Sequence, residues 1–273
     1  MFEQTRPTSK TRSAWALLEL IYHATVREIR KDYSNALIGL ILNMVQTVTL
    51  VFAFFLLFVV IGIRGSPVRG DFLLYIMSGI FIFIVHVKTV SSLITAEGPS
   101  SQMMKHAPMN TIVAILAAAF GQLYIQILSV LAVLYIYHIA FTPITIHNFA
   151  GAAGMLFLAW FTGVAVGVVF IAIKPWAPQF VTVASAVYNR VNMIASGKMF
   201  LANSLPSAQL QLFDWNPLFH IIDQARGYTF LNYNPHYTSV SYPLQVGIAL
   251  IMIGLMAEFY TRKTASLSWD ARR

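Results

Sequence analysis

Long apolar stretches alternate with short polar segments along the 273-residue chain, and six of these stretches are long enough to cross a membrane. A helix needs about 20 apolar residues to span the hydrocarbon core of a bilayer. The pattern therefore predicts six transmembrane helices, at 37–63, 72–96, 111–141, 149–173, 179–201 and 243–260. The stretch 179–201 is the most polar of the six, because it contains Asn189, Arg190, Asn192 and Lys198.

The segment before the first predicted span has a different period. Between residues 12 and 33, apolar residues recur every three or four positions, and charged residues gather toward its carboxyl end. This spacing predicts an amphipathic helix that lies in the headgroup layer of the membrane. Two roles stay open for this helix: an anchor of the fold, or a gate or docking element.

Two segments outside the spans also carry structural signals. Residues 97–108 contain helix breaks at Gly98-Pro99 and at Pro108 on either side of a serine-capped stretch, which predicts a short interfacial helix. Residues 202–242 hold an apolar helical run after Asn216-Pro217 and then an aromatic-rich tail. Because proline fits the first turn of a helix, we expect a re-entrant or interface-lying helical hairpin before the last span. The whole chain, 1–273, is thus predicted to be one all-α membrane domain.

Composition supports a membrane protein and excludes an ordinary soluble enzyme. Hydrophobic residues make up 58% of the chain and charged residues 10%, whereas a soluble domain is about 25% charged. Most of the 18 Lys and Arg residues behind the net charge of +8 lie before the first span, after the last span, or in the loops on the same side. Basic residues concentrate on the cytoplasmic side, so both termini are predicted to be cytoplasmic.

The residue types that carry catalysis or bind cofactors are scarce. The chain has no cysteine, which excludes disulfides and thiolate metal sites. It contains neither a GxxxxGK[ST] phosphate loop nor an HExxH zinc motif. No pair of carboxylates lies within a span, where it could relay protons. We therefore predict no catalytic residue, cofactor or metal site. The glycines of 149–173 instead favour close helix packing: Gly151, Gly154, Gly163 and Gly167.

Four basic or titratable residues lie at membrane depth: His86, Lys88, Arg190 and Lys198. Such residues are costly in lipid and usually mark a polar path. Aromatic and amide groups near them suit sugar rings, which stack on aromatic faces and bind amides. The candidate path comprises Tyr75, Phe81, Phe83, His86, Lys88, Tyr188, Arg190, Asn192 and Lys198. As alternatives, each aromatic serves packing, Lys198 reaches the outer interface, and Arg190 pairs within the bundle.

Two motifs resemble those of a known family. The order of an amphipathic helix and a six-span bundle is similar to that in the membrane subunit of ABC exporters of capsular polysaccharide and lipopolysaccharide O-antigen. The helix ends in Val26-Arg27-Glu28-Ile29-Arg30-Lys31-Asp32-Tyr33. A second segment resembles the NP-x-x-H-x-[IV]-[ED]-x-x-R motif of these permeases: Asn216-Pro217-Leu218-Phe219-His220-Ile221-Ile222-Asp223-Gln224-Ala225-Arg226. The second span, with Leu74, Gly79, Phe81 and Phe83, is also similar. The first span differs, because family members often have tryptophan and proline where this chain has residues 40–46.

The resemblance implies a half-transporter of the bacterial inner membrane, in which two copies of the chain pair with two copies of a separate ABC ATPase that binds ATP and magnesium. It implies that the amino-terminal helix gates the cytoplasmic mouth and that 97–108 couples to the ATPase, through Gln102, Met103, Met104, Lys105 and His106. The outer hairpin would shape the exit with Asn216, Pro217, His220, Asp223 and Arg226. Asp223 and Arg226 lie three residues apart on one helix face, where an ion pair would simply hold the hairpin together.

The expected function is outward transport of a polysaccharide. Expected partners are membrane lipid and periplasmic and outer-membrane export components, and nucleic acid is not expected. Two alternatives stay open: an ABC permease that exports a drug or small lipid, and a membrane-embedded enzyme of glycan or lipid metabolism. The second would need clustered carboxylates or histidines.

Overall fold

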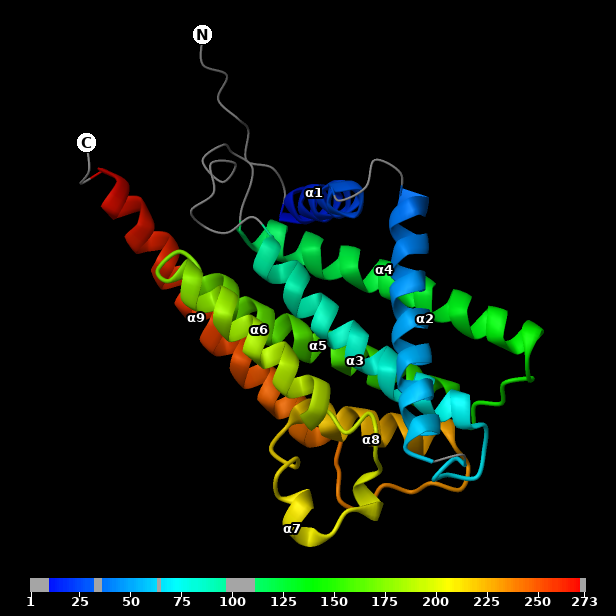
Figure 1. Ribbon diagram of the computed structural model, residues 1–273. Helices are drawn as coiled ribbons and strands as arrows, with labels where there is room; N and C mark the ends of the chain where they lie inside the picture. Colours follow the sequence, from blue (N-terminus) through cyan, green and yellow to red (C-terminus); the bar gives the residue numbers. More distant parts are fainter. Residues whose placement is uncertain (1–9, 32–35, 63–64, 97–110, 271–273) are drawn as a thin grey trace.

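A computed structural model describes residues 10–31, 36–62, 65–96 and 111–270, and these ranges contain helices but no strand (Figure 1). The long helices are α1 (Lys10–Lys31), α2 (Ala36–Val60), α3 (Phe72–Thr95), α4 (Thr111–Ala140), α5 (Phe149–Ile173), α6 (Pro178–Ala195), α8 (Pro217–Thr229) and α9 (Ser241–Asp270). A short 3₁₀ helix, η2 (Ala202–Ser204), and the one-turn helix α7 (Ser207–Leu210) precede α8. The all-α prediction is confirmed over the described residues.

Five helices in the described ranges are long and apolar enough to cross a membrane. They are α2 over Leu37–Val60, α3 over Phe72–Thr95, α4 over Thr111–Ala140, α5 over Phe149–Ile173 and α9 over Ser241–Thr264. These helices coincide with five of the six predicted spans.

The predicted span 179–201 does not form one long helix. α6 ends at Ala195, and Gly197 then adopts a φ of +71°, a left-handed conformation that favours glycine. The ring of Phe219 fills the space that a Cβ at position 197 would need. Polar residues make α6 less apolar than the five membrane-spanning helices, and this polarity excludes it from them. The number of six spans therefore stays a prediction.

α3 is the central helix of the bundle. Most of its length is buried, and it packs against α2, α4, α5 and α8. Gly163 of α5 lies where a Cβ would collide with the carbonyl oxygen of His86, so the two helices approach closely. Gly167 contacts Leu93 in the same way, so the predicted packing role is confirmed for Gly163 and Gly167. It is wrong for Gly154, because nothing lies within 4 Å of a Cβ at that position. Close packing matters here because lipid is as apolar as these side chains and drives no hydrophobic association.

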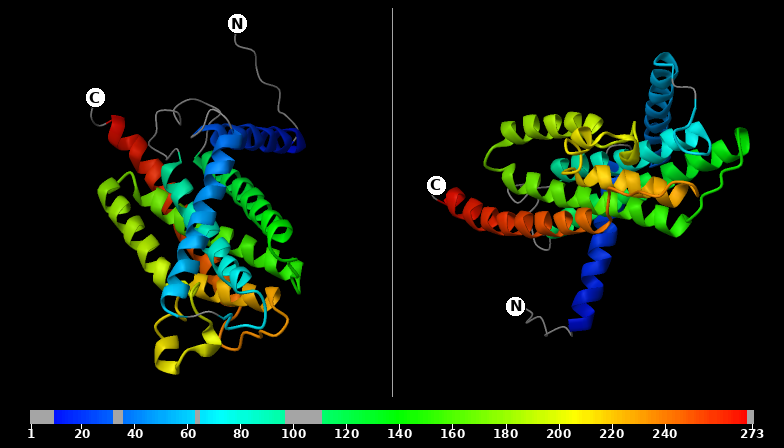
Figure 2. Two further views of the ribbon diagram at one scale, coloured as in Figure 1. Left: turned by 45° about the vertical axis from the view of Figure 1, so that its right-hand side comes forward. Right: turned by 90° about the horizontal axis from the view of Figure 1, so that it is seen from below.

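α1 lies across one end of the bundle, and α8 lies near the other (Figures 1 and 2). The amphipathic helix predicted at 12–33 is thus confirmed as a helix, with bounds Lys10–Lys31. Ala24 of α1 packs against Val113 and Ala117 of α4. Trp15 and Tyr22 stay exposed, as expected of a helix with an apolar face for lipid. Its location in the headgroup layer stays a prediction.

The segment 202–242 contains the two short helices η2 and α7, then α8, and then a long return loop to α9. The predicted helix start at Pro217 is confirmed: Asn216 is the N-cap, and its side chain accepts a hydrogen bond from the backbone N–H of Leu218. Phe219, Ile221 and Ile222 are fully buried, which anchors α8 beneath α3 and α5. Re-entry of this segment into the membrane stays a prediction.

Candidate functional site

The motif residues Asn216 and His220 connect α8 to its neighbours through side-chain hydrogen bonds. The Asn216 amide donates to Oδ1 of Asn192 and to the carbonyl of Ala195, each at 3.0 Å. Nδ1 of His220 accepts from the backbone N–H of Ser239 at 3.1 Å, so Nε2 carries the proton and donates to the carbonyl of Asp214 at 2.6 Å. These two residues therefore tie the start of α8 to the end of α6 and to the return loop.

Arg226 is completely buried, and backbone carbonyls surround its guanidinium. It donates to the carbonyls of Gly197, Lys198 and Phe200, which follow the end of α6. Its Cζ atom lies 4.3 Å from the ring centroid of Tyr75 in α3, a cation–π distance. This one side chain therefore joins α8, α3 and the 197–200 turn.

Asp223 is also buried but has other partners. Its carboxylate accepts hydrogen bonds from the backbone N–H of Ala202 and from the hydroxyls of Tyr233 and Thr238. Burial and the neighbouring carboxylate raise the pKa of the Tyr233 phenol, so this tyrosine is a neutral donor at physiological pH. Among the described residues, Asp223 and Arg226 form no ion pair. Loop carbonyls bind Arg226, and two hydroxyls and a backbone N–H bind Asp223, in place of the expected pair.

Lys198 points into the bundle. Its Nζ atom donates to the carbonyl of Met193 and lies 3.7 Å from the ring centroid of Phe83 and 5.1 Å from that of Phe54. The residue is 2% exposed, so its amine does not reach the outer interface as the alternative proposed.

His86 is held by three side-chain or backbone oxygens. Nδ1 lies 3.2 Å from the carbonyl of Ala159 and 3.1 Å from the hydroxyl of Thr162, and Nε2 lies 2.7 Å from the hydroxyl of Tyr188. A carbonyl can only accept, so Nδ1 donates to Ala159 and Nε2 accepts from Tyr188. His86 and Tyr188 thus form one link between α3, α5 and α6.

The residues of the candidate path have different surroundings within the single chain, and their role in a path stays a prediction. Tyr75, Phe81 and Phe83 belong to the buried core of the bundle, which matches the packing alternative. Arg190 is exposed on α6 and makes neither an ion pair nor a hydrogen bond within the described chain. Lys88 is half-buried on α3 and donates to Oε1 of Gln46 at 2.6 Å.

Two further expectations have limited structural coverage. The coupling residues Gln102, Met103, Met104, Lys105 and His106 lie outside the described residues. In the ranges that the structure covers, no group of three or more His, Asp or Glu side chains is placed to hold a metal ion.

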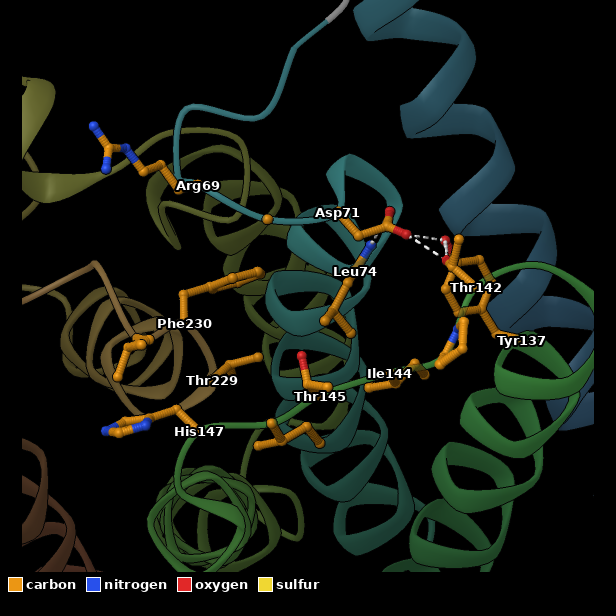
Figure 3. Close-up of a pocket in the computed structure, with 14 residues that line it drawn as sticks. Arg69, Asp71, Leu74, Tyr137, Thr142, Ile144, Thr145, His147, Thr229 and Phe230 are labelled. Atoms are coloured by element: carbon orange, nitrogen blue, oxygen red, sulfur yellow. Dashed lines mark hydrogen bonds between the residues drawn. The ribbon is translucent and has the colours of Figure 1, made fainter.

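A cavity of about 450 Å³ lies at the α8 end of the molecule, and sequence reasoning missed its organising residue, Asp71 (Figure 3). Oδ1 of Asp71 caps α3 by accepting from the N–H of Leu73 at 2.7 Å. Oδ2 accepts from the hydroxyls of Tyr137 and Thr142 at 2.5 and 2.7 Å. Burial alone would raise the pKa of this carboxyl, but the hydrogen bonds outweigh it and lower the pKa. An aspartate directly before an apolar run is a known N-cap signal and would have located it.

Figure 3 shows how the cavity is walled. Asp71 turns toward Tyr137 and Thr142. Arg69 and His147 lie on the opposite side of the cavity, and their side chains point away from Asp71. Phe230 and Thr229, at the end of α8, close the wall between them. The loop before α5 is fixed to this end of α8, because the N–H groups of His147 and Asn148 donate to the carbonyls of Thr229 and Tyr228.

Comparison with known proteins gives one informative match. Residues 19–230 match the sequence model of a family described as "ABC-2 type transporter". A search of curated proteins found no match. The matched range begins within α1 and ends directly after α8, so it includes the motif from Asn216 to Arg226 and four of the five membrane-spanning helices. This range is well over half of the chain, and the protein therefore belongs to the ABC-2 type transporter family, as a multi-pass membrane component.

Proposed function

We propose that this chain is the permease subunit of an ABC exporter that moves a polysaccharide of the capsular or O-antigen type out of the cell. The single observation that carries the choice of substrate is the motif from Asn216 to Arg226, which resembles that of polysaccharide permeases. Membership of the ABC-2 type transporter family supports the transport role. Asn216, His220, Asp223 and Arg226 each have defined hydrogen-bond partners, and α8 is fixed to α6 through Asn216 and to α3 through the contact of Arg226 with Tyr75.

Two copies of the chain surround the translocation path in this proposal. Arg190 is exposed in the second half of α6, on a face that also exposes Thr182 and Ala186. An arginine at this depth is costly in lipid and is tolerated where it meets water or another protein surface. We therefore place this face of α6 toward the second copy, where Arg190 contributes positive charge to the path of an anionic glycan.

ATP hydrolysis takes place in a separate partner in this proposal. Two ABC ATPase subunits bind ATP and magnesium, and residues 97–108 transmit their closure to α3 and α4, between which this segment lies in the sequence. α1 acts as a gate at the cytoplasmic mouth. The chain lies in the bacterial inner membrane with both termini in the cytoplasm, and periplasmic and outer-membrane components receive the polymer.

Deletion and complementation test the proposed function. Deleting the gene should leave polymer trapped in the cytoplasm, and a plasmid copy should restore it to the surface. An Arg190→Gln variant should export less polymer at normal protein levels, whereas Arg190→Lys should retain most export because it keeps the charge. Normal surface glycan together with altered drug sensitivity in the deletion strain would instead support export of a drug or small lipid.

A further inference from the structure

A polar cavity of about 350 Å³ lies between α1, α2, α3 and α4, at the end of the bundle where α1 crosses it. Its walls come from the first turns of α2, the last turns of α3 and the middle of α4. The polar lining residues are Glu28, Asn43, Gln46, Lys88, Ser91, Ser92, Thr95 and Gln122. A cavity of this size accommodates a small ligand or headgroup. Polar lining at membrane depth is costly, which points to a ligand rather than to packing.

Lys88 supplies the positive charge of this cavity. Lys88 lines the cavity, whereas the other three basic or titratable residues at membrane depth do not. His86 and Lys198 are buried in the bundle, and Arg190 is exposed on α6. One N–H of the Lys88 ammonium binds Oε1 of Gln46. An ammonium has three donors, so two remain for a ligand.

Other groups in the cavity add unused donors. Because Gln46 accepts from Lys88 through its oxygen, its NH₂ group is free to donate. Within the described chain, the amide of Gln122 and the hydroxyl of Ser91 have no hydrogen-bond partner, although both line the cavity. Asn43, which also lines the cavity, is fixed by hydrogen bonds with Gln126 and Ser129. A cavity rich in donors with one cation suits an acceptor-rich anion.

We propose that this cavity binds the phosphate group of an amphipathic lipid, with Lys88 as the principal contact. The non-bridging oxygens of a lipid phosphate or diphosphate can accept hydrogen bonds from Lys88, Gln46, Gln122 and Ser91. Glu28 lines the α1 side of the same cavity, and its carboxylate repels a phosphate, so the phosphate lies on the Lys88 side. The apolar lining residues Ile29, Leu40 and Ile125 contact the adjoining lipid chain.

Two sources supply this chemistry: the lipid carrier of a glycan, or an ordinary anionic phospholipid. The role of the cavity as a substrate site rests on the proposed export of a lipid-linked glycan, whereas phosphate binding by Lys88 does not depend on that function. A binding measurement on the permease alone therefore tests phosphate binding separately from glycan export. Surface glycan that is normal in the deletion strain would contradict the proposed function and leave the phosphate site intact.

The test measures binding to the purified full-length chain in nanodiscs made of a neutral phospholipid. The probes are geranylgeranyl diphosphate, geranylgeraniol as the same chain without phosphate, and dioleoyl phosphatidylglycerol. Wild type should bind the diphosphate at least about tenfold more tightly than the alcohol. Lys88→Gln should lose about tenfold in affinity for the diphosphate, Lys88→Arg should recover most of it, and Lys263→Gln on α9 should match wild type.

A second variant guards against misfolding of Lys88→Gln. Gln122→Leu replaces the unpaired amide with an apolar side chain of similar volume. It should weaken diphosphate binding several-fold and leave the thermal unfolding midpoint unchanged. Equal binding of phosphatidylglycerol, also dependent on Lys88, would identify the source as phospholipid and support the site. Binding of the alcohol as tight as that of the diphosphate, or unchanged affinity in both variants, would overturn the proposal.

Discussion

Arg226 and Asp223 are buried charged residues whose hydrogen-bond partners come from different segments of the chain. Arg226 satisfies three carbonyls after α6, and Asp223 satisfies hydroxyls and an N–H around the return loop. A spacing of three residues on one helix predicted an ion pair. Local spacing shows which side chains can meet, but the fold brings nearer partners to each. The expected role of holding the hairpin together nevertheless agrees with these contacts.

Gly79 in α3 provides the space that Arg226 needs. A Cβ at this position would lie 2.9 Å from Nη2 of Arg226 and 3.0 Å from the carbonyl oxygen of Lys198. Gly79→Ala should therefore destabilise the protein by about 1–3 kcal/mol, the usual cost of overpacking. The thermal unfolding midpoint of the purified protein in detergent measures this effect.

Gly154→Ala is the matched control, because nothing lies within 4 Å of a Cβ at that position in α5. It should be neutral or stabilise the helix by up to about 1 kcal/mol. An unchanged midpoint in Gly79→Ala, with the same result in Gly154→Ala, would show that the close approach of Arg226 is unimportant.

Asp71→Asn tests the carboxylate that caps α3. Asparagine keeps the cap but removes the charge that the hydroxyls of Tyr137 and Thr142 bind. We expect a loss of about 1–2 kcal/mol at pH 7, as for other hydrogen bonds to charged groups. Thermal unfolding of both proteins measures it.

The pH dependence of this difference follows from the lowered pKa of Asp71. A depressed folded-state pKa stabilises the protein above the unfolded-state pKa of about 3.9, and the stabilisation is lost as the pH falls through the folded-state value. The gap between wild type and Asp71→Asn should therefore be constant from pH 5 to 7 and shrink below about pH 4. A gap that widens on acidification would contradict this assignment.

At the scale of elements, α1 packs along α4. Ala24 packs against Val113 and Ala117 of α4, while the opposite face of α1 is exposed. Ala24→Phe should displace α1 from α4, since a buried phenyl ring does not fit at a contact made by alanines. Spin labels on α1 and α4 should report a longer and broader distance distribution in this variant.

His23→Phe is the control for this prediction. It adds the same ring at the neighbouring position, where the side chain is exposed, and should leave the distance unchanged. An unchanged distance in Ala24→Phe would mean that α1 is held by contacts other than this one.

α6 is the element that the sequence described least well. Its apolar residues extend to position 201, so residue composition predicts a longer helix than Pro178–Ala195. The helix ends because Gly197 turns and the following carbonyls bind Arg226, which is distant in the sequence. Periodicity within a segment carries no information on such a partner.

At the scale of the whole molecule, topology is open to direct measurement. The chain has no cysteine, so single cysteine substitutions report accessibility without background. Lys105→Cys should react with a membrane-impermeant maleimide only from the cytoplasmic side, and Tyr237→Cys only from the periplasmic side, because basic residues concentrate in the cytoplasmic segments. Tyr237 is exposed, so its replacement leaves the buried network in place.

The reverse labelling pattern, with residue 105 reached from the periplasm, would overturn both the orientation and the coupling role of 97–108. Labelling of both positions from one side would instead require an even number of spans between them. That result would question α6 first, since it is the long hydrophobic helix least suited to crossing the membrane.

The sequence alone determined the five long apolar helices and the amphipathic helix α1, because hydrophobic length and amphipathic period are local properties of the chain. It located the start of α8 at Pro217 and the family motif that follows. Only the tertiary structure decided how the polar residues are used. Lys198 and His86 became buried links and Lys88 came to line a cavity. The reason is physical: the energy of a buried polar group depends on partners that other helices supply, and those partners are set by packing and not by neighbouring residues.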